Sequence, residues 1–497
     1  MQSLLDILDL VERHSSKPES QKAVSNTENA RETIALVVQD TNRLTVDGLL
    51  TQEAMTPGNE PAMPLAVENK ETQEERDKEQ IQGTSSLSMS VFNLSNSIVG
   101  SGILGLSYAL ANTGIVLFLF LFIVITGVTK YSINLLLRCS EKTGCLNFEN
   151  MGEKVYGTKG KYVIFGTTFI QNMGAILLYL FIIKNELPGV IKVFMGKEDK
   201  FLAWYVDDRV LIILVTAIII FPLCLMKNLE FLGYTSGFSL FCMIFFLIVI
   251  IQKKFELSCS VSYTKTLSNE TEEMCTARYI VLNFESVYAL PTIAFAYVCH
   301  QAILPIYRDL KNRSLEKMKI VTNISLLSMC VLYLMTAFFG YLTFYGEVQP
   351  SLLHTYSSES IIIVIVRLSV MTSITFTVPV LFLTSRESLA ELLRKSHFNT
   401  GERTVIAMIL LSIEVFIVIF IPTMKDVFGV LGTTTSTTLI FIIPTTLFLK
   451  VTSSDSEKKS ERLWAFSFLA LGLMFSAVSI PLVVYDWATS SSTSETN

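Results

Sequence analysis

Residues 95–108 read SNSIVGSGILGLSY and lie where the apolar pattern of the chain predicts a membrane-spanning helix. Gly100 and Gly102 interrupt this pattern, beside the polar residues Asn96 and Ser101. A helix in lipid must satisfy its own backbone hydrogen bonds, so irregular backbone at membrane depth is tolerated only where it lines a protein cavity. The stretch therefore predicts a broken helix with a binding site at the break.

The composition places this break within a polytopic membrane protein. Of the 497 residues, 51% are hydrophobic and only 17% are charged, and about 20 apolar residues suffice for one crossing of a bilayer. We expect an all-α protein with eleven spans, at residues 87–111, 115–138, 161–183, 209–226, 231–251, 286–307, 318–345, 360–384, 404–422, 427–449 and 463–485.

The charges of the loops predict the orientation of these spans. Lys and Arg gather in the segments 307–319, 385–396 and 449–462, whereas 346–360 and 486–497 contain neither. Positively charged loops remain on the cytoplasmic side of a membrane. We therefore expect a cytoplasmic N-terminus and an extracellular C-terminus, which requires an odd number of spans.

Three further regions are predicted around the spans. Residues 1–85 carry about twice as many acidic as basic residues and few aromatics, which predicts a disordered cytoplasmic tail without a cleavable signal peptide. The tail could dock regulatory proteins. Residues 86–488 form the expected transporter domain, and residues 489–497 a short extracellular C-terminus.

The segment 252–285 is expected to be an extracellular loop. Cys259 and Cys275 are the only two of the eight cysteines that fall in an outer loop, so we expect a disulfide between them, worth about 3 kcal/mol. The same loop contains Asn269 in the sequence SNET, the only glycosylation sequon on the outer side.

A second interrupted span lies five spans after the first. Residues 290–307 read LPTIAFAYVCHQAILPIY, with prolines around a middle of small residues. Paired interrupted spans are typical of transporters with internal repeats, and five spans per repeat invert the second copy in the membrane. We expect spans one to five and six to ten to be inverted repeats, with span eleven peripheral and with Phe295, Ala296 and Tyr297 in the substrate site.

The chemistry of the break indicates what it binds. Backbone N–H groups freed near Ser101 and Gly102, together with the positive end of the helix dipole, favour a carboxylate. The oxygens of Ser95 and Asn96 favour a cation. The second break has no acidic or basic side chain other than His300, so the site suits a zwitterion with a neutral side chain accompanied by a metal ion.

Several longer motifs strengthen this interpretation. They are SLSMSVFNLSNSIVGSGILGLSYALANTG (86–114), IQNMGAILLYLFIIKNELP (170–188), NLEFLGYTSGFSL (228–240), FGYLTFYGEV (339–348) and SIPLVVYDWA (479–488). Together they resemble the sodium-coupled neutral amino acid transporter family, in particular its system A branch.

The resemblance implies the inverted-repeat fold of amino acid, polyamine and organocation transporters. It also implies a plasma-membrane protein that cotransports Na⁺ with small neutral amino acids such as glutamine, alanine and serine. The family's sodium ligands correspond to Asn96 and to Thr377, in TFTVPV. The expected partners are thus an amino acid, sodium and the lipid bilayer, and no nucleic acid.

Three features leave alternatives open. Arg367 could pair structurally or act in gating, and Glu414 could couple protons or hold a hydrogen bond between helices. The run GTTTSTTL (432–439) could form a hydrophilic path or bond back to its own helix. Glu414 makes a proton-coupled transporter one alternative function. An amino acid sensor that does not transport, with the acidic tail docking a signalling partner, is the other. An enzyme is disfavoured, because no convergent catalytic set is visible.

Overall fold

The computed structural model describes residues 83–195, 207–226, 232–257, 276–356, 360–393, 395, 398–420, 423–453 and 459–494. The predictions for the tail up to residue 82, for Cys259, Cys275 and Asn269, and for residues 495–497 lie outside these ranges. The described residues are helical almost throughout, and the only bridge between extended segments among them joins Ser85 to Leu310.

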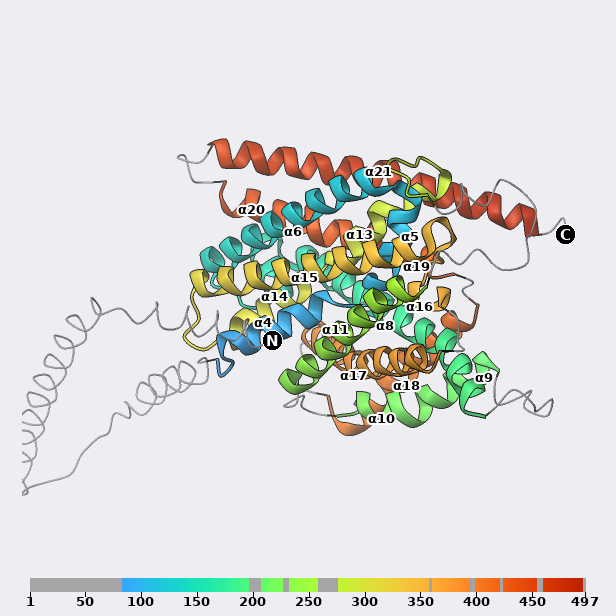
Figure 1. Cartoon of the computed structure of the whole chain (residues 1–497). Coiled ribbons are helices and arrows are strands. Elements are labelled where there is room, and N and C mark those ends of the chain that lie inside the picture. Colours follow the sequence, from blue (N-terminus) through green and yellow to red (C-terminus); the bar gives the residue numbers. More distant parts are fainter. Residues whose placement is uncertain are drawn as a thin grey trace, which may run out of the picture. The chain divides into compact units, whose positions relative to one another are not determined.

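Among the described residues, nine helical segments are long and apolar enough to cross a membrane, and one bent pair of helices makes a tenth (Figure 1). In chain order these spans are α4 (Leu87–Ile98) with α5 (Gly102–Thr113), α6 (Ile115–Thr143), α8 (Thr158–Met195), α11 (Leu232–Glu256), α13 (Ala289–Tyr297) with α14 (His300–Asp309), α15 (Leu315–Phe344), α17 (Ile361–Leu392), α18 (Thr400–Phe420), α19 (Met424–Leu431) with α20 (Ile443–Val451), and α21 (Lys459–Ser494).

The remaining predicted span, 209–226, is helical but short. It consists of α9 (Asp208–Val215), a π-helical turn (Thr216–Ile220) and α10 (Phe221–Cys224). At 1.5 Å per residue this segment is about 25 Å long, which is near the lower limit for a crossing. The sequence pattern also missed α7 (Phe148–Tyr156) and α16 (Leu352–Thr355), because both are too short to produce a membrane signal.

Helix packing divides most spans into two groups. In the first group, α4 and α5 pack on α15, α5 packs on α13, and α6 packs on both α13 and α15. In the second group, α8 packs against α17 and α18. The helix α11 contacts α17 on one side and α4 and α15 on the other, so it lies between the two groups (Figure 1).

This packing has the pattern expected of two inverted repeats. Spans one and six, two and seven, and three and eight are each separated by five spans, and each of these pairs packs together. In α21 28% of the most apolar stretch is buried, as in α6 and α18, against 78% in α13 with α14. The predicted all-helical membrane fold, with two broken helices and a peripheral last helix, is confirmed.

Candidate functional site at the two helix breaks

Both predicted helix breaks are present. The helix α4 ends at Ile98, Val99 is extended (φ −69°, ψ 96°), and α5 begins at Gly102 with a bend of 53°. In span six, Val298 is extended (φ −73°, ψ 111°) between α13 and α14. Each break removes intrahelical hydrogen bonds and leaves backbone N–H and C=O groups available at membrane depth.

The two breaks lie against each other. A Cβ atom placed on Gly102 would be 2.7 Å from both the Cα and the Cβ atom of Ala296, a distance that ordinary Cβ atoms do not reach. Only glycine therefore permits this approach of α5 to α13. Of the residues predicted for the substrate site, Gly102 and Ala296 are thus brought into direct contact.

A tyrosine of span seven bridges the breaks. The hydroxyl of Tyr333 lies 2.6 Å from the carbonyl oxygen of Ile98 and 3.0 Å from that of Ala296, and its side chain is fully buried. A phenol has one proton, so the hydroxyl donates to one carbonyl or is shared between the two. Tyr333 was not predicted, because an intramembrane tyrosine has no sequence signal that identifies its partners.

A second tyrosine marks the level of the break on span three. The hydroxyl of Tyr179, in α8, lies 2.9 Å from the position that a Cβ atom of Gly100 would occupy. The neighbouring Ser101 is buried, and its hydroxyl has no hydrogen-bond partner among the described residues. Gly100 therefore borders α8, and Ser101 keeps a free polar group at the start of α5.

The other two predicted residues of span six point toward packed aromatic side chains. The Phe295 ring packs edge-on against Phe428 of α19, with 5.3 Å between ring centroids. The Tyr297 ring packs against Phe122 and Tyr333, at 5.3 and 5.5 Å. These rings hold α13 against α19, α6 and α15, while Ala296 contacts the first break.

The predicted sodium ligands lie on α4 and α17, two helices that pack against α11. Asn96 donates from Nδ2 to the Ser236 hydroxyl at 3.4 Å, and its Oδ1 atom has no partner among the described residues. The Thr377 hydroxyl, in α17, donates to the carbonyl of Ser373 at 2.9 Å. Asn96 therefore has a free acceptor oxygen, whereas the Thr377 hydroxyl retains acceptor capacity after donating its proton.

A chain of hydroxyl groups lies between these two residues. Ser236 and Ser239 are one turn apart on α11, and Ser239 forms a hydrogen bond with Ser373 of α17. Uncharged oxygens thus extend from α4 across α11 to α17. Such oxygen ligands are the type that hard cations prefer. Asn96 and Thr377 share no direct hydrogen bond in the described structure.

The threonine-rich run mostly bonds to its own helix. The hydroxyls of Thr433 and Thr434 donate to carbonyls four residues earlier, and that of Thr437 to a carbonyl five residues earlier. The run forms two π-helical turns. Thr435 and Ser436 also lie within hydrogen-bond distance of Oε1 of Gln171 in α8, so the run joins span ten to span three.

The two charges at membrane depth differ in their surroundings. Arg367 forms an ion pair with Glu186 of α8 at 3.0 Å, and the two side chains are 4% and 1% exposed. Arg367 also donates to the carbonyl of Tyr356 at 2.9 Å. Glu414 is buried in α18, and its Oε2 atom has no hydrogen-bond partner among the described residues. The structure therefore supports a structural pairing of Arg367.

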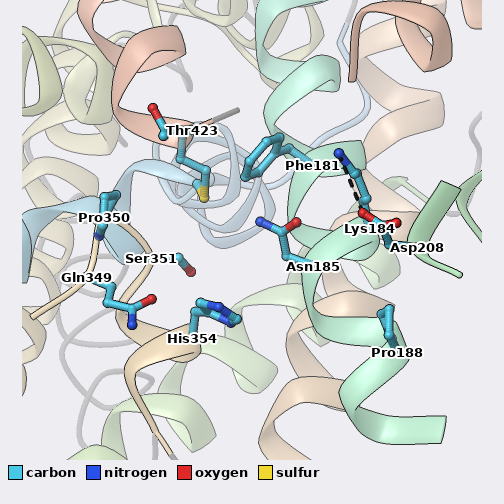
Figure 2. A pocket seen from close by; sticks show the side chains of 11 residues that line it. Phe181, Lys184, Asn185, Pro188, Asp208, Gln349, Pro350, Ser351, His354 and Thr423 are labelled. Carbon is cyan, nitrogen blue, oxygen red and sulfur yellow. Dashed lines mark ion pairs between the residues drawn. The ribbon is translucent and has the colours of Figure 1, made fainter. Parts of the chain in front are cut away.

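A cavity lies beyond the break, toward the C-terminal end of α8. It has a volume of about 380 Å³, and its walls come from α8, the start of α9, the loop around α16 and the start of α19 (Figure 2). His354, in α16, borders it. Burial, with a smaller contribution from the positive charge of Arg367, lowers the pKa of His354 below its usual value of 6.5.

Comparison with known proteins identifies the family. Residues 83–485 match the family described as transmembrane amino acid transporter protein. A relative from Danio rerio, sodium-coupled neutral amino acid symporter 2, is 44% identical over 429 residues, which cover 83% of this chain and 85% of that protein. The chain belongs to the transmembrane amino acid transporter family.

The crystal structure of MhsT in complex with L-phenylalanine has the same overall fold, with a TM-score of 0.55 at 12% identity. The likeness covers 81% of this chain and 99% of that chain. The resemblance found in the sequence is thus confirmed at the level of the family and of the fold. Membership in this family makes the chain a multi-pass membrane transporter of amino acids rather than an enzyme.

Proposed function

We propose that this transporter couples the inward movement of Na⁺ to the uptake of small neutral amino acids, of the glutamine, alanine and serine type, by alternating access. The observation that carries the proposal is the contact of the two helix breaks, with Gly102 against Ala296 and Tyr333 bonded to a carbonyl of each break. The name of the Danio rerio relative supports both the sodium coupling and the neutral substrate.

The amino acid is bound where the breaks free backbone groups. The N–H groups at the start of α5, around Ser101 and Gly102, bind its carboxylate, because the helix dipole is positive there. Freed carbonyls accept hydrogen bonds from its ammonium group. The side chain of the substrate is neutral, because the second break has no acidic or basic side chain other than His300, and the Nε2 atom of His300 is already bonded to Ser132 at 2.9 Å.

Sodium is bound on the α11 side of α4. Asn96 contributes its free Oδ1 atom, and Thr377 contributes its hydroxyl oxygen from α17. The entry of one Na⁺ across 100 mV releases about 2.3 kcal/mol, which drives an accumulation of about fiftyfold. During the cycle, the group of α4, α5, α6, α13 and α15 rocks against the group of α8, α17 and α18.

The same proposal assigns the topology. The N-terminal tail faces the cytoplasm and the C-terminus faces the outside of the plasma membrane, as the loop charges indicate. Cys259 and Cys275 then form an extracellular disulfide, and Asn269 carries a glycan.

Uptake of labelled alanine and glutamine by expressing cells, with Na⁺ replaced by choline, tests the function. We expect uptake only with Na⁺. Uptake that persists in choline and follows an inward proton gradient would instead favour proton coupling, for which the unpartnered Glu414 is the candidate residue. Amino acid binding without any uptake, together with partner binding that is lost when residues 1–80 are deleted, would favour a sensor.

The sodium ligands are tested by activation curves. We expect Asn96→Ala and Thr377→Ala to raise the Na⁺ concentration for half-maximal uptake while surface expression is unchanged. Thr377→Ser should have a smaller effect, because it keeps the oxygen. Unchanged activation curves in both alanine variants would remove the assignment.

A further inference from the structure

The cavity beyond the break is separate from the site at the break. Tyr179 lies against Gly100 and marks the level of the break on α8. Phe181, Lys184 and Asn185 line the cavity from the same helix, two, five and six residues further along. At 1.5 Å per residue, the wall that they form begins about 3 Å beyond Tyr179 along the helix axis, and its polar residues lie about 8–9 Å beyond it. Under the proposed topology, the cavity is therefore on the extracellular side of the break.

The cavity carries both signs of charge. The ammonium group of Lys184 is 3.7 Å from a carboxylate oxygen of Asp208 and donates to the carbonyl of Val418 at 3.1 Å (Figure 2). The Lys184 side chain is only 10% exposed, whereas that of Asp208 is 44% exposed. An ammonium group has three donors, so Lys184 can still bind an anion, and Asp208 can still accept hydrogen bonds from a cation.

Uncharged polar groups complete the walls. The hydroxyl of Ser351 is buried at the edge of the cavity and has no hydrogen-bond partner among the described residues. Figure 2 shows Asn185 and His354 directed into the space between α8 and the loop around α16. An unsatisfied buried hydroxyl costs about 1–3 kcal/mol, so a ligand that bonds to Ser351 would recover part of this cost.

These groups select one class of ligand. A simple anion is repelled by Asp208 and a simple cation by Lys184, whereas a zwitterion satisfies both. Phe181, Pro188 and Met424 add apolar walls, and a volume of about 380 Å³ suits a small molecule. We propose that this cavity is a second binding site for a neutral amino acid, which holds the substrate before it reaches the helix breaks. The proposal rests on the proposed transport function.

The first test is protection of an introduced cysteine. Asn185→Cys is treated with a positively charged thiol reagent that does not cross membranes, in Na⁺-free buffer, with and without saturating alanine. We expect alanine to slow the modification at least fivefold. The matched control is Val193→Cys, on the same helix but outside the cavity, which alanine should not protect. Equal protection at both positions, or protection at neither, would overturn the proposal.

The second test separates this site from the transport function. Asp208→Asn should raise the KM for alanine about tenfold, the ratio that corresponds to losing one hydrogen bond to a charged group, with the Na⁺ activation curve unchanged. Glu347→Gln, an exposed acid near the cavity but outside its walls, should leave KM unchanged. If the wild type shows no Na⁺-dependent uptake, the proposed function fails. If uptake is normal and Asp208→Asn keeps the wild-type KM, only the second site fails.

Discussion

The ion pair between Arg367 and Glu186 makes a sharp prediction about stability. The two side chains are 4% and 1% exposed, so water screens their 3.0 Å contact very little. Removal of one partner of a buried pair leaves an uncompensated charge and costs about 3–5 kcal/mol. Arg367→Met also leaves the carbonyls of Leu353 and Tyr356 without their donor. We therefore expect Arg367→Met to be more destabilising than Glu186→Gln, which keeps these two hydrogen bonds.

The double variant tests whether the pair acts as a unit. In Glu186→Gln with Arg367→Met no charge is left buried, so its loss of stability should be smaller than the sum of the two single losses, by about 1–3 kcal/mol. Gel filtration of each purified variant after heating measures its heat stability, and the difference from the wild type gives the loss of stability. The control is Glu461→Gln, which breaks the exposed pair with Arg138 at 3.2 Å and should cost at most about 1 kcal/mol. Strict additivity of the two single variants would refute the reasoning.

Three further predictions concern the break and the outer cavity. Gly102→Ala places a methyl group 2.7 Å from the Cα atom of Ala296 and should reduce uptake at least about tenfold at normal surface expression, whereas Gly127→Ala, with nothing within 4 Å, should not. Tyr333→Phe removes the one hydroxyl proton that the Ile98 and Ala296 carbonyls share, which should cost about 1–3 kcal/mol and slow uptake about tenfold or more. Wild-type uptake would contradict the bridging role. The pKa of His354 is lowered in the folded state, so on acidification the unfolded chain binds the proton first. The contribution of neutral His354 to stability is therefore complete above pH 6.5 and is lost as the pH falls below this value. Heat stability should therefore fall less between pH 7.5 and 5.5 in His354→Gln than in the wild type, and an equal fall would exclude this residue.

The sequence predicted those parts of the site that depend on local backbone chemistry. Gly100, Gly102 and the prolines of span six indicated both breaks, because lipid tolerates irregular backbone only beside a cavity. The contact between the breaks and the bridge through Tyr333 were not predictable. They depend on which faces of α5, α13 and α15 meet, and one sequence does not encode this as a readable pattern.

Glu186 illustrates a second limit of the sequence pattern. The third span was predicted to end at residue 183, directly before Lys184, Asn185 and Glu186. The helix α8 instead continues to Met195, and its charges are satisfied by Arg367 and by the pair with Asp208. Polar residues mark the end of a span only where they reach water, and here other helices supply their partners.

The contacts at the breaks indicate where the proposed rocking motion occurs. Spans one and six are in direct contact at Gly102 and Ala296, and the Tyr333 hydroxyl of span seven contacts a carbonyl of each. In the proposed motion, these three spans therefore move together. Between this group and α11, Lys254 donates to the carbonyl of Leu342 in α15, whereas the link from Asn96 to Ser236 is a long hydrogen bond of 3.4 Å. Such a bond is weak and is readily exchanged for another partner. Under the proposed function, a sodium ion bound to Asn96 Oδ1 would lie at this boundary, beside the hydrogen bond from Asn96 to Ser236.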